Sequence, residues 1–288
     1  MDQAEKLRFL MKKNLELSSK LKKPIGIYTI ASGKGGVGKT NVVVNLAIAL
    51  QKRGKKVLII DADLGMANVD VILGLYPQST LYDVLFHGKS FEETIINGPE
   101  GIKILPGGSG IMEMATLSVE KQEAIAHEFL TLEDIDIILI DTGAGISKNL
   151  LSFITFSQEL IIVTTPEPTA LTDAYSVIKV MANYKLKDKI QIIINKCPNG
   201  ISAINTYEKL RKTTDAFLKV QLVSIGYILE DPRVVNSVMK QIPFVIQYPQ
   251  CIASKCIDTI ADKILGQKNS IKIKSIQEVY NRLLKVFG

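Results

Sequence analysis

The stretch Gly33-Lys34-Gly35-Gly36-Val37-Gly38-Lys39-Thr40 decides the fold of this 288-residue chain. It follows an apolar, β-branched run, Ile25–Ala31, and precedes a helical pattern over Asn41–Arg53. This order of strand, glycine-rich loop and helix is the context that a phosphate-binding P-loop requires. Glycines let the backbone curl so that several N–H groups point at phosphate oxygens, and the helix N-terminus adds positive charge. The segment therefore predicts a nucleotide-binding α/β domain.

The two polar residues that end this loop predict its chemistry. Lys39 is expected to reach the β- and γ-phosphates of ATP, and the Thr40 hydroxyl is expected to ligate Mg²⁺. A chance glycine-rich turn is the alternative, but such a turn does not need the full eight-residue pattern between a strand and a helix. The residues expected to contact the nucleotide here are Gly33, Lys34, Gly35, Gly36, Val37, Gly38, Lys39, Thr40 and Asn41.

Short apolar runs bounded by glycine, proline or aspartate recur along the chain and are typical of strands buried on both faces. After Ile25–Ala31, these runs are Val57–Asp61, Ile102–Leu105, Ile135–Asp141, Glu159–Thr165, Gln191–Asn195 and Phe244–Gln247. Helical patterns lie at Asn41–Arg53, Ser118–Leu130, Ala170–Tyr184 and Asn205–Leu218. This alternation predicts a single α/β domain over residues 24–266, with a mostly parallel twisted sheet and helices on both faces.

Three carboxylates follow two of the predicted strands. Asp61 and Asp63 end one strand, and Asp141 ends another in the manner of a Walker B strand. Ligands of open α/β sheets bind at the carboxyl ends of the strands. Mg²⁺ prefers oxygen ligands and keeps several waters, so Asp61 and Asp141 are candidates to hold metal-bound water. Any one of these residues alone would be interpreted as a strand-end turn residue.

The segment GKGGVGKT resembles the signature of the ParA/MinD ATPases, which are single-domain P-loop NTPases of the SIMIBI class with a deviant Walker A motif. Their additional early lysine corresponds to Lys34. The resemblance implies that Lys34 reaches across an ATP-sandwich homodimer to the partner's nucleotide, as an arginine finger does. Asp63 matches the family aspartate that orients the attacking water. The expected catalytic residues of a Mg²⁺-dependent ATPase activated by dimerisation are thus Lys34, Lys39 and Asp63.

Further segments resemble the family at single positions. Asp63–Asp70 and Gly143–Ile146 resemble two switch segments that order and disorder with the nucleotide state. Asn195 and Lys196 resemble the adenine-reading position, where an amide can both donate and accept hydrogen bonds. An ordinary turn asparagine is the alternative. Pro232 lies in a segment that resembles the loop closing over adenine.

Two acidic residues resemble positions at the family's dimer interface. Glu167 matches a residue that contacts the nucleotide across the dimer, and Asp173 matches one on the dimer and partner face. Together with Lys34 they form the predicted dimer face. Both carboxylates have an alternative interpretation as solvated charges near a helix start.

Positive charge is concentrated at the two ends of the chain. The net charge is +6, with +4 in residues 1–23, +4 in residues 266–288 and about −2 in the rest. A DNA-binding body would carry a basic surface, so direct DNA binding is not expected. Basic ends favour contacts with an acidic partner or an anionic membrane.

The N-terminal segment, residues 1–23, reads as a short amphipathic helix. Its start, Asp2-Gln3-Ala4-Glu5-Lys6-Leu7-Arg8, resembles the DQAxxLR motif of the FlhG (FleN/YlxH) family, which controls flagellar number and placement. The resemblance implies that it stimulates FlhF, an SRP-type GTPase, with Gln3 helping to position a water. Flagellar basal-body components and a transcriptional regulator are further partners of that family. The partner-activating residues would be Asp2, Gln3, Leu7 and Arg8.

The C-terminal segment, Ile271–Gly288, has the pattern of a basic amphipathic helix. Such a helix at a free terminus favours attachment to an anionic membrane surface, and the FlhG and MinD families end similarly. We therefore expect a cytoplasmic protein that binds reversibly at the inner face of the cell membrane. Packing on the domain is the alternative. The apolar stripe is Ile276, Val279, Tyr280, Leu283, Leu284 and Phe287.

Other members of the same fold remain as alternatives for the function. A MinD-type division-site ATPase usually has Ser-Pro where this chain has Thr142-Gly143, and a ParA-type partitioning ATPase would need the basic body. A metal-cluster carrier would need paired cysteines, whereas Cys197, Cys251 and Cys256 lack such spacing. A bacterial tyrosine kinase would need a tyrosine-rich tail.

Overall fold

The computed structural model describes residues 25–63, 68–108, 128, 132 and 134–266. Within these residues one eight-stranded sheet has the order β3-β4-β2-β5-β1-β6-β7-β8, and every neighbouring pair is parallel except β3 with β4. The strands are β1 Gly26–Ser32, β2 Val57–Ala62, β3 Ile96–Asn97, β4 Lys103–Leu105, β5 Ile137–Ala144, β6 Glu159–Thr164, β7 Lys189–Cys197 and β8 Gln221–Leu229.

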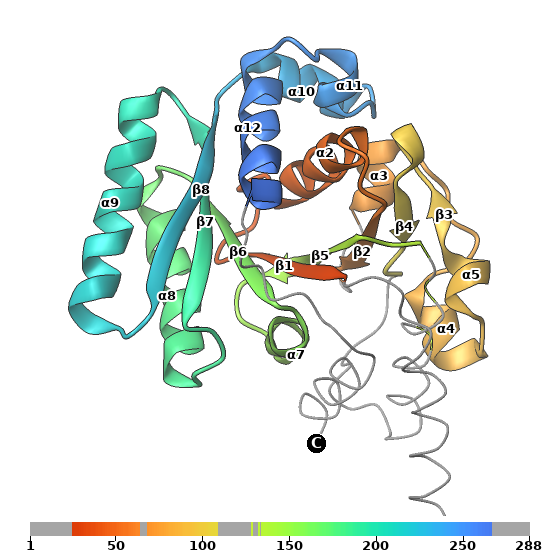
Figure 1. Cartoon of the computed structure of the whole chain (residues 1–288), viewed down its shortest axis with the longest axis horizontal. Coiled ribbons are helices and arrows are strands. Elements are labelled where there is room, and N and C mark those ends of the chain that lie inside the picture. Colours follow the sequence, from red (N-terminus) through yellow and green to blue (C-terminus); the bar gives the residue numbers. More distant parts are fainter. Residues whose placement is uncertain (1–24, 64–67, 109–127, 129–131, 133, 267–288) are drawn as a thin grey trace, which may run out of the picture.

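Helices cover both faces of this sheet (Figure 1). Residues of α2, α3, α11 and α12 pack in one apolar cluster on one face. Residues of α4, α5, α7, α8 and α9 pack in two clusters on the other. The helices are α2 Lys39–Lys52, α3 Val69–Leu73, α4 Leu81–His87, α5 Phe91–Thr94, α7 Lys148–Phe156, α8 Pro168–Asn183, α9 Gly200–Phe217, α10 Pro232–Met239, α11 Phe244–Gln247 and α12 Ile252–Gly266, with a 3₁₀ turn η1 at Pro99–Gly101.

The strand β1 occupies the topological switch point of the sheet. It pairs with β5 on one side and β6 on the other, so the chain that leaves its carboxyl end enters a crevice between diverging connections. That chain is the P-loop, followed at once by α2. Every residue of α2 from Val42 to Leu50 is buried, which anchors the loop on a rigid helix.

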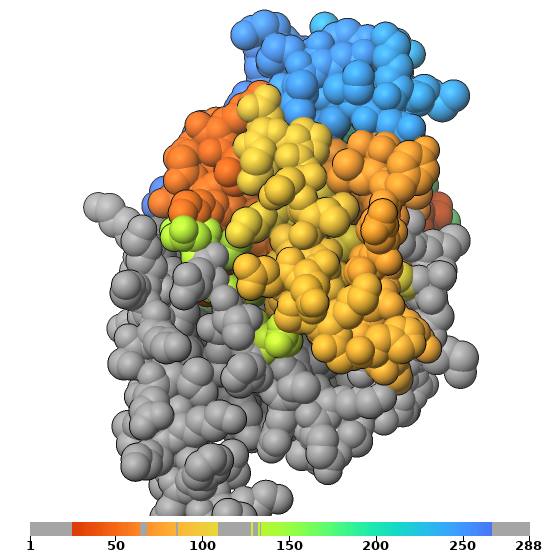
Figure 2. All heavy atoms as spheres, turned by 90° about the vertical axis from the view of Figure 1, so that its right-hand side faces the viewer, coloured from red at the N-terminus to blue at the C-terminus, as the bar shows by residue number. Residues whose placement is uncertain are grey.

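The edge of the sheet next to β4 is covered by short elements. Figure 2 faces this edge and shows the segment containing α3 and α4 beside β3 and β4, with the segment from α10 to α12 above them. A hydrogen bond of 2.7 Å from Gln241 Nε2 to the Val71 carbonyl joins the turn after α10 to α3. The two segments that flank the carboxyl ends of the strands are therefore in direct contact.

The predicted fold class is confirmed, as are six of the predicted strand locations, but Phe244–Gln247 was wrongly predicted as a strand. It forms the helix α11 because Pro243 precedes it as N-cap and the Val245 N–H donates to the Asn45 side chain of α2 at 3.1 Å. The two edge strands of the sheet, the short β3 and β8, were not predicted.

Several predictions concern residues that the structure does not describe. These are the N-terminal segment 1–23, the helix Ser118–Leu130 apart from Glu128, part of the first switch segment, and the C-terminal segment Ile271–Gly288. Within the described part of the chain, no helix is both long and apolar enough to cross a bilayer.

Candidate nucleotide-binding site

The P-loop curls because its glycines adopt conformations or approaches that other residues resist. Gly36 and Gly38 have φ angles of 77° and 87°, in the left-handed region, and Gly38 is the N-cap of α2. Gly33 lies against α8, where an added Cβ would stand 2.2 Å from the Asp173 carbonyl carbon. The loop thus meets α8 at its start and opens α2 at its end.

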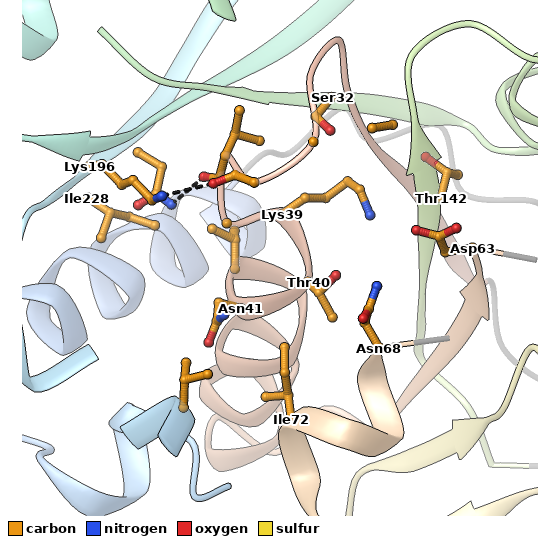
Figure 3. Close-up of a pocket in the computed structure, with 18 of the residues that line it drawn as sticks. Ser32, Lys39, Thr40, Asn41, Asp63, Asn68, Ile72, Thr142, Lys196 and Ile228 are labelled. Atoms are coloured by element: carbon orange, nitrogen blue, oxygen red, sulfur yellow. Dashed lines mark hydrogen bonds between the residues drawn. The ribbon is translucent and has the colours of Figure 1, made fainter. Parts of the chain in front are cut away.

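A cavity of about 1080 Å³ lies beside this loop at the carboxyl ends of the strands. Small-molecule sites have volumes of roughly 300–1,000 Å³, so a nucleotide fits. Figure 3 shows Lys39, Thr40, Asp63 and Asn68 around one space. Of the predicted site residues, the cavity is lined by Gly35, Gly36, Val37, Gly38, Lys39, Thr40, Asn41, Asp63, Asn195 and Lys196.

A buried ion pair joins the P-loop to the Walker B strand. The Lys39 ammonium donates to Asp141 Oδ1, with 7% and 0% of the two side chains exposed. Burial raises the pKa of the Asp141 carboxyl, while the Lys39 charge and the nearby Thr40 hydroxyl lower it. A buried charge is costly unless an opposite charge lies beside it, so each member of this pair stabilises the other. The pair therefore holds the Lys39 side chain near the carboxyl end of β5.

Asp61 is engaged with the backbone that follows β2. Its Oδ1 accepts the Asp63 N–H at 3.1 Å, and its Oδ2 accepts those of Asn68 and Val69 at 3.0 and 3.1 Å. Burial, and next the charge of Asp141, raise the pKa of Asp61 to about 7, and these N–H donors oppose the rise. Asp61 is not among the residues that line the cavity. In this structure it holds Asp63 at the start of the first switch segment and Asn68 and Val69 near its end.

The two predicted switch segments meet at Asp63. This residue lines the cavity, and a Cβ added at Gly143 would lie 3.3 Å from its Oδ1. Beyond Gly143, the Ser147 side chain caps α7 by accepting the Leu150 N–H at 3.1 Å. The Asp63 carboxylate therefore borders the same cavity as the P-loop lysine, Lys39.

Lys34 does not line the cavity of its own chain. Its ammonium donates to Glu167 Oε2 and to Thr169 Oγ1, each at 3.0 Å. The pair is open to solvent, with 40% of the Lys34 side chain and 62% of the Glu167 side chain exposed. The structure therefore brings together two of the residues predicted for the dimer face, and the third, Asp173, contacts Gly33 through its backbone.

Asn195 and Lys196 hydrogen-bond the P-loop itself. Asn195 Nδ2 donates to the Val37 carbonyl and Lys196 Nζ to the Gly36 carbonyl, both at 2.8 Å. Pro232 is exposed at the first turn of α10 and does not line the cavity, although its neighbour Asp231 does. Asp231 caps α10 by accepting the Arg233 N–H at 3.0 Å, and the paired Arg233 guanidinium lowers the pKa of its carboxyl.

An apolar wall of the cavity and three polar positions were not predicted from the sequence. The wall comes from the end of β8 and from α10 and α11, and finding it would have required recognising β8. Nothing in the local sequence marks the polar positions, which come from the ends of β1 and the start of α7. The polar residues are Ser32, Ser147 and Asn149, and the wall includes Ile228, Val234, Val235, Val238 and Phe244.

The donor atoms of the site fit a hard divalent cation. Asp141 Oδ2 and Ser32 Oγ are buried without a hydrogen-bond partner among the described residues. Ser32, Thr40 and Asp63 line the cavity with side-chain oxygen atoms, and Asp141 lies outside the lining, next to Thr142, which belongs to it. Mg²⁺ prefers such ligands and takes the remainder from phosphate and water, so no three-carboxylate cluster is needed. The described residues contain no such cluster.

The fold and this site define a P-loop nucleoside triphosphatase. The model of a family described as an AAA domain matches residues 25–194. The chain belongs to the MinD/ParA family of ATPases and is FlhG-like within it, with ATP hydrolysis as its activity.

The relatives include flagellar and septum-site proteins. The antiactivator FleN of Pseudomonas aeruginosa is 38% identical, over 84% of this chain and 86% of its own. The flagellum site-determining protein YlxH of Helicobacter pylori is 34% identical, over 90% of each chain. The structure of the septum site-determining protein MinD from Pyrococcus horikoshii, complexed with Mg-ADP, has a TM-score of 0.68 and 29% identity, covering 87% of this chain and 99% of that one.

Proposed function

We propose that this chain is an ATP-dependent switch that regulates the number or placement of flagella. In this proposal it binds Mg²⁺ with ATP, dimerises, associates with the inner face of the cell membrane and hydrolyses ATP to reset. The relatives that are named an antiactivator and a flagellum site-determining protein support the flagellar assignment. The observation that carries the nucleotide chemistry is the cavity that gathers Lys39, Thr40 and Asp63 beside the P-loop.

Residues in and next to the cavity have separate chemical roles in this proposal. The P-loop amides and Lys39 bind the phosphates, and the Thr40 hydroxyl with the Asp141 carboxylate offers oxygen atoms to the metal or to its waters. Mg²⁺, when bound, neutralises charge that develops on the phosphate oxygens. Asp63 accepts a hydrogen bond from the attacking water and so fixes its direction, which is a positioning role. Asp61 supports Asp63 because its side-chain Oδ1 accepts the Asp63 backbone N–H.

The second lysine acts on a neighbouring copy. Lys34 lies outside its own cavity, at an exposed rim, beside Glu167 and near Asp173. A charge at the rim completes a site only when a second subunit presents a nucleotide to it, so we assign Lys34, Glu167 and Asp173 to the interface of an ATP-sandwich homodimer. We assign Asn195 and Lys196, which line the cavity, to the neighbourhood of the base, together with the segment of Pro232, which itself lies outside the lining.

In this proposal the two ends of the chain bind the partner protein and the membrane. We divide the protein into an activator segment at residues 1–23, the ATPase domain at residues 24–266 and a membrane-targeting helix at residues 271–288. Dimerisation pairs two weak membrane anchors, which makes attachment depend on ATP. The segment Asp2–Arg8 engages an FlhF-type GTPase, and flagellar basal-body components and a transcriptional regulator are further partners in this proposal.

A GTPase assay tests the flagellar assignment. The full chain with Mg-ATP should stimulate GTP hydrolysis by the FlhF of the same organism. Gln3→Ala should reduce the stimulation about tenfold or more, as expected for loss of a group that positions water. Lys6→Ala is the matched control, because position 6 is variable in the DQAxxLR pattern. Absent stimulation, or equal stimulation by the Gln3→Ala chain, would instead favour a division-site or partitioning ATPase.

A further inference from the structure

Two consecutive residues at the end of β7 hold the outer side of the P-loop. The Asn195 amide donates to the Val37 carbonyl and the Lys196 ammonium donates to the Gly36 carbonyl, each at 2.8 Å. Figure 3 shows Lys196 directed at the loop, with both hydrogen bonds dashed. The partners are 158 and 160 residues apart in the sequence, so the sheet brings them together.

The glycine part of this loop, which Lys196 holds, has little other support from packing, whereas Val37, which Asn195 holds, is buried in the core. Gly35 and Gly36 are exposed, and a Cβ added to either would meet nothing within 4 Å. Glycine loses more conformational freedom on ordering than any other residue. A P-loop binds phosphate through N–H groups that converge inward, and each inward N–H requires the preceding carbonyl of its peptide to turn outward. Donors placed outside the loop therefore favour the phosphate-binding orientation of these peptides.

The backbone of Lys196 is held in a conformation that its side chain does not favour. Its φ is 53°, in the left-handed region, which costs a non-glycine residue on the order of 1 kcal/mol or more. Asn195 is packed close to the loop, because a Cβ added at Gly38 would lie 2.4 Å from its Nδ2. Strained backbone of this kind persists where the surroundings over-determine it, often at a functional site.

We infer that Lys196 is a positioning residue that orders the phosphate loop, with Asn195 as its buried partner, and that its main effect is on triphosphate binding rather than on the choice of base. The inference rests on the nucleotide site proposed above. It assigns to Lys196 a role that the resemblance to an adenine-reading position does not include.

Ligands that lack one half of ATP separate these two roles. A residue that orders the loop affects ATP and inorganic tripolyphosphate by the same factor and leaves adenosine unaffected. A residue that reads the base affects ATP and adenosine and leaves tripolyphosphate unaffected. The dissociation constants of the three ligands are measured by titration calorimetry on the full chain with Mg²⁺.

The informative variant is Lys196→Gly. Glycine adopts the left-handed conformation without strain, so the variant should fold with unchanged or higher thermal stability, and weaker binding then reports the lost hydrogen bond. Since an exposed hydrogen bond contributes little, we expect about fivefold weaker binding of both ATP and tripolyphosphate. Lys196→Arg keeps a donor and should restore part of the loss.

Lys185→Gly is the matched control. Lys185 is a second lysine in the left-handed region, with a φ of 52°, in the turn after α8 and away from the cavity. Its replacement should leave all three dissociation constants unchanged. Unchanged tripolyphosphate binding in Lys196→Gly, beside normal binding by the unmodified chain, overturns the inference. An unmodified chain that binds neither ATP nor tripolyphosphate overturns the phosphate site and this inference with it.

Discussion

Gly33 sets how closely the P-loop approaches α8. There is no room for a side chain there, because a Cβ would stand 2.2 Å from a backbone carbon and 2.3 Å from a backbone oxygen of Asp173. Backbone atoms inside a helix cannot move aside as the end of a flexible side chain can. The contact therefore fixes the start of the P-loop, and with it Lys34, to the helix that begins one residue after Glu167.

We expect Gly33→Ala to lower the free energy of unfolding by about 1–3 kcal/mol, the usual cost of overpacking. Gly35→Ala is the control, since a Cβ at Gly35 meets nothing within 4 Å and Gly35 has no positive φ. Urea denaturation of both full-length variants measures the difference. Equal urea midpoints for the two variants would show that α8 moves to accommodate the added methyl group.

Among the larger elements, α2 carries the P-loop at one end and is fixed to α12 at the other. Arg53, just after α2, donates to Asp258 Oδ1 at 2.9 Å, to Asp262 Oδ1 at 2.6 Å and to the Asp258 carbonyl at 3.1 Å. It also donates a hydrogen bond of 2.9 Å to the backbone carbonyl of Ala49 in α2. Arg53 is partly buried, with 23% of its side chain exposed, whereas the side chains of Asp258 and Asp262 are 48% and 67% exposed, so solvent screens part of this network.

Arg53→Met keeps the apolar stem and removes the network, so we expect a loss of about 1–2 kcal/mol in the free energy of unfolding at pH 7. Arg211→Met on the exposed face of α9 should change this free energy by less than about 0.5 kcal/mol, because exposed helix pairs usually contribute no more than that.

The Arg53 guanidinium lowers the pKa of Asp262 in the folded state. A lowered pKa contributes stability above the unfolded pKa that is lost as the pH falls through the folded value.

The difference between the native chain and Arg53→Met should therefore shrink as the pH is lowered below about 4, the ordinary aspartate range. Urea midpoints measured from pH 7 downward test this. A difference that stays constant as Asp262 becomes protonated would mean that the network acts through packing of the arginine stem alone.

The C-terminal segment gives a prediction that depends on its apolar stripe. Leu283→Glu with Leu284→Glu should abolish ATP-dependent binding to vesicles of anionic phospholipid, because two apolar anchors become charged. Gln277→Glu with Asn281→Glu adds the same charge on the polar face and should only weaken binding, by roughly 1 kcal/mol per added charge. Co-sedimentation measures both. If the two pairs behave alike, charge and not the stripe governs attachment.

How far an element can be predicted depends on where its determinants lie. Buried central strands such as β1 and β5 are continuous apolar runs, and the P-loop identifies itself by local glycine spacing, so both were predictable. Phe244–Gln247 favours a strand by composition, yet a distant side chain, Asn45, accepts its N–H and a helix forms. The engagement of Asp61 with Asn68 and Val69, and of Asn195 with Val37, likewise depends on the folded arrangement.

For the whole molecule, the central question is whether one site is built from two chains. Lys34 is held at the rim by Glu167 while Lys39 and Asp63 belong to the cavity of the same chain. If Lys34 acts in trans, a defect in Lys34 and a defect in Asp63 damage different sites of a mixed dimer. Lys34→Ala should keep its own cavity intact, and Asp63→Ala should bind ATP and accumulate as a dimer, while each variant alone should hydrolyse ATP at least about 100-fold more slowly.

Mixing the two variants should restore hydrolysis. In a mixed dimer the Lys34→Ala subunit has a normal Asp63 and receives Lys34 from its partner, so one of the two sites is complete. If the chains pair at random, about half of the dimers are mixed, and the mixture should regain about a quarter of the unmodified rate. Mixing Asp63→Ala with Lys39→Ala is the control, because neither subunit then has an intact cavity. Phosphate release from equimolar mixtures measures the effect. If the mixture of Lys34→Ala and Asp63→Ala is no faster than either variant alone, Lys34 acts on the nucleotide of its own chain.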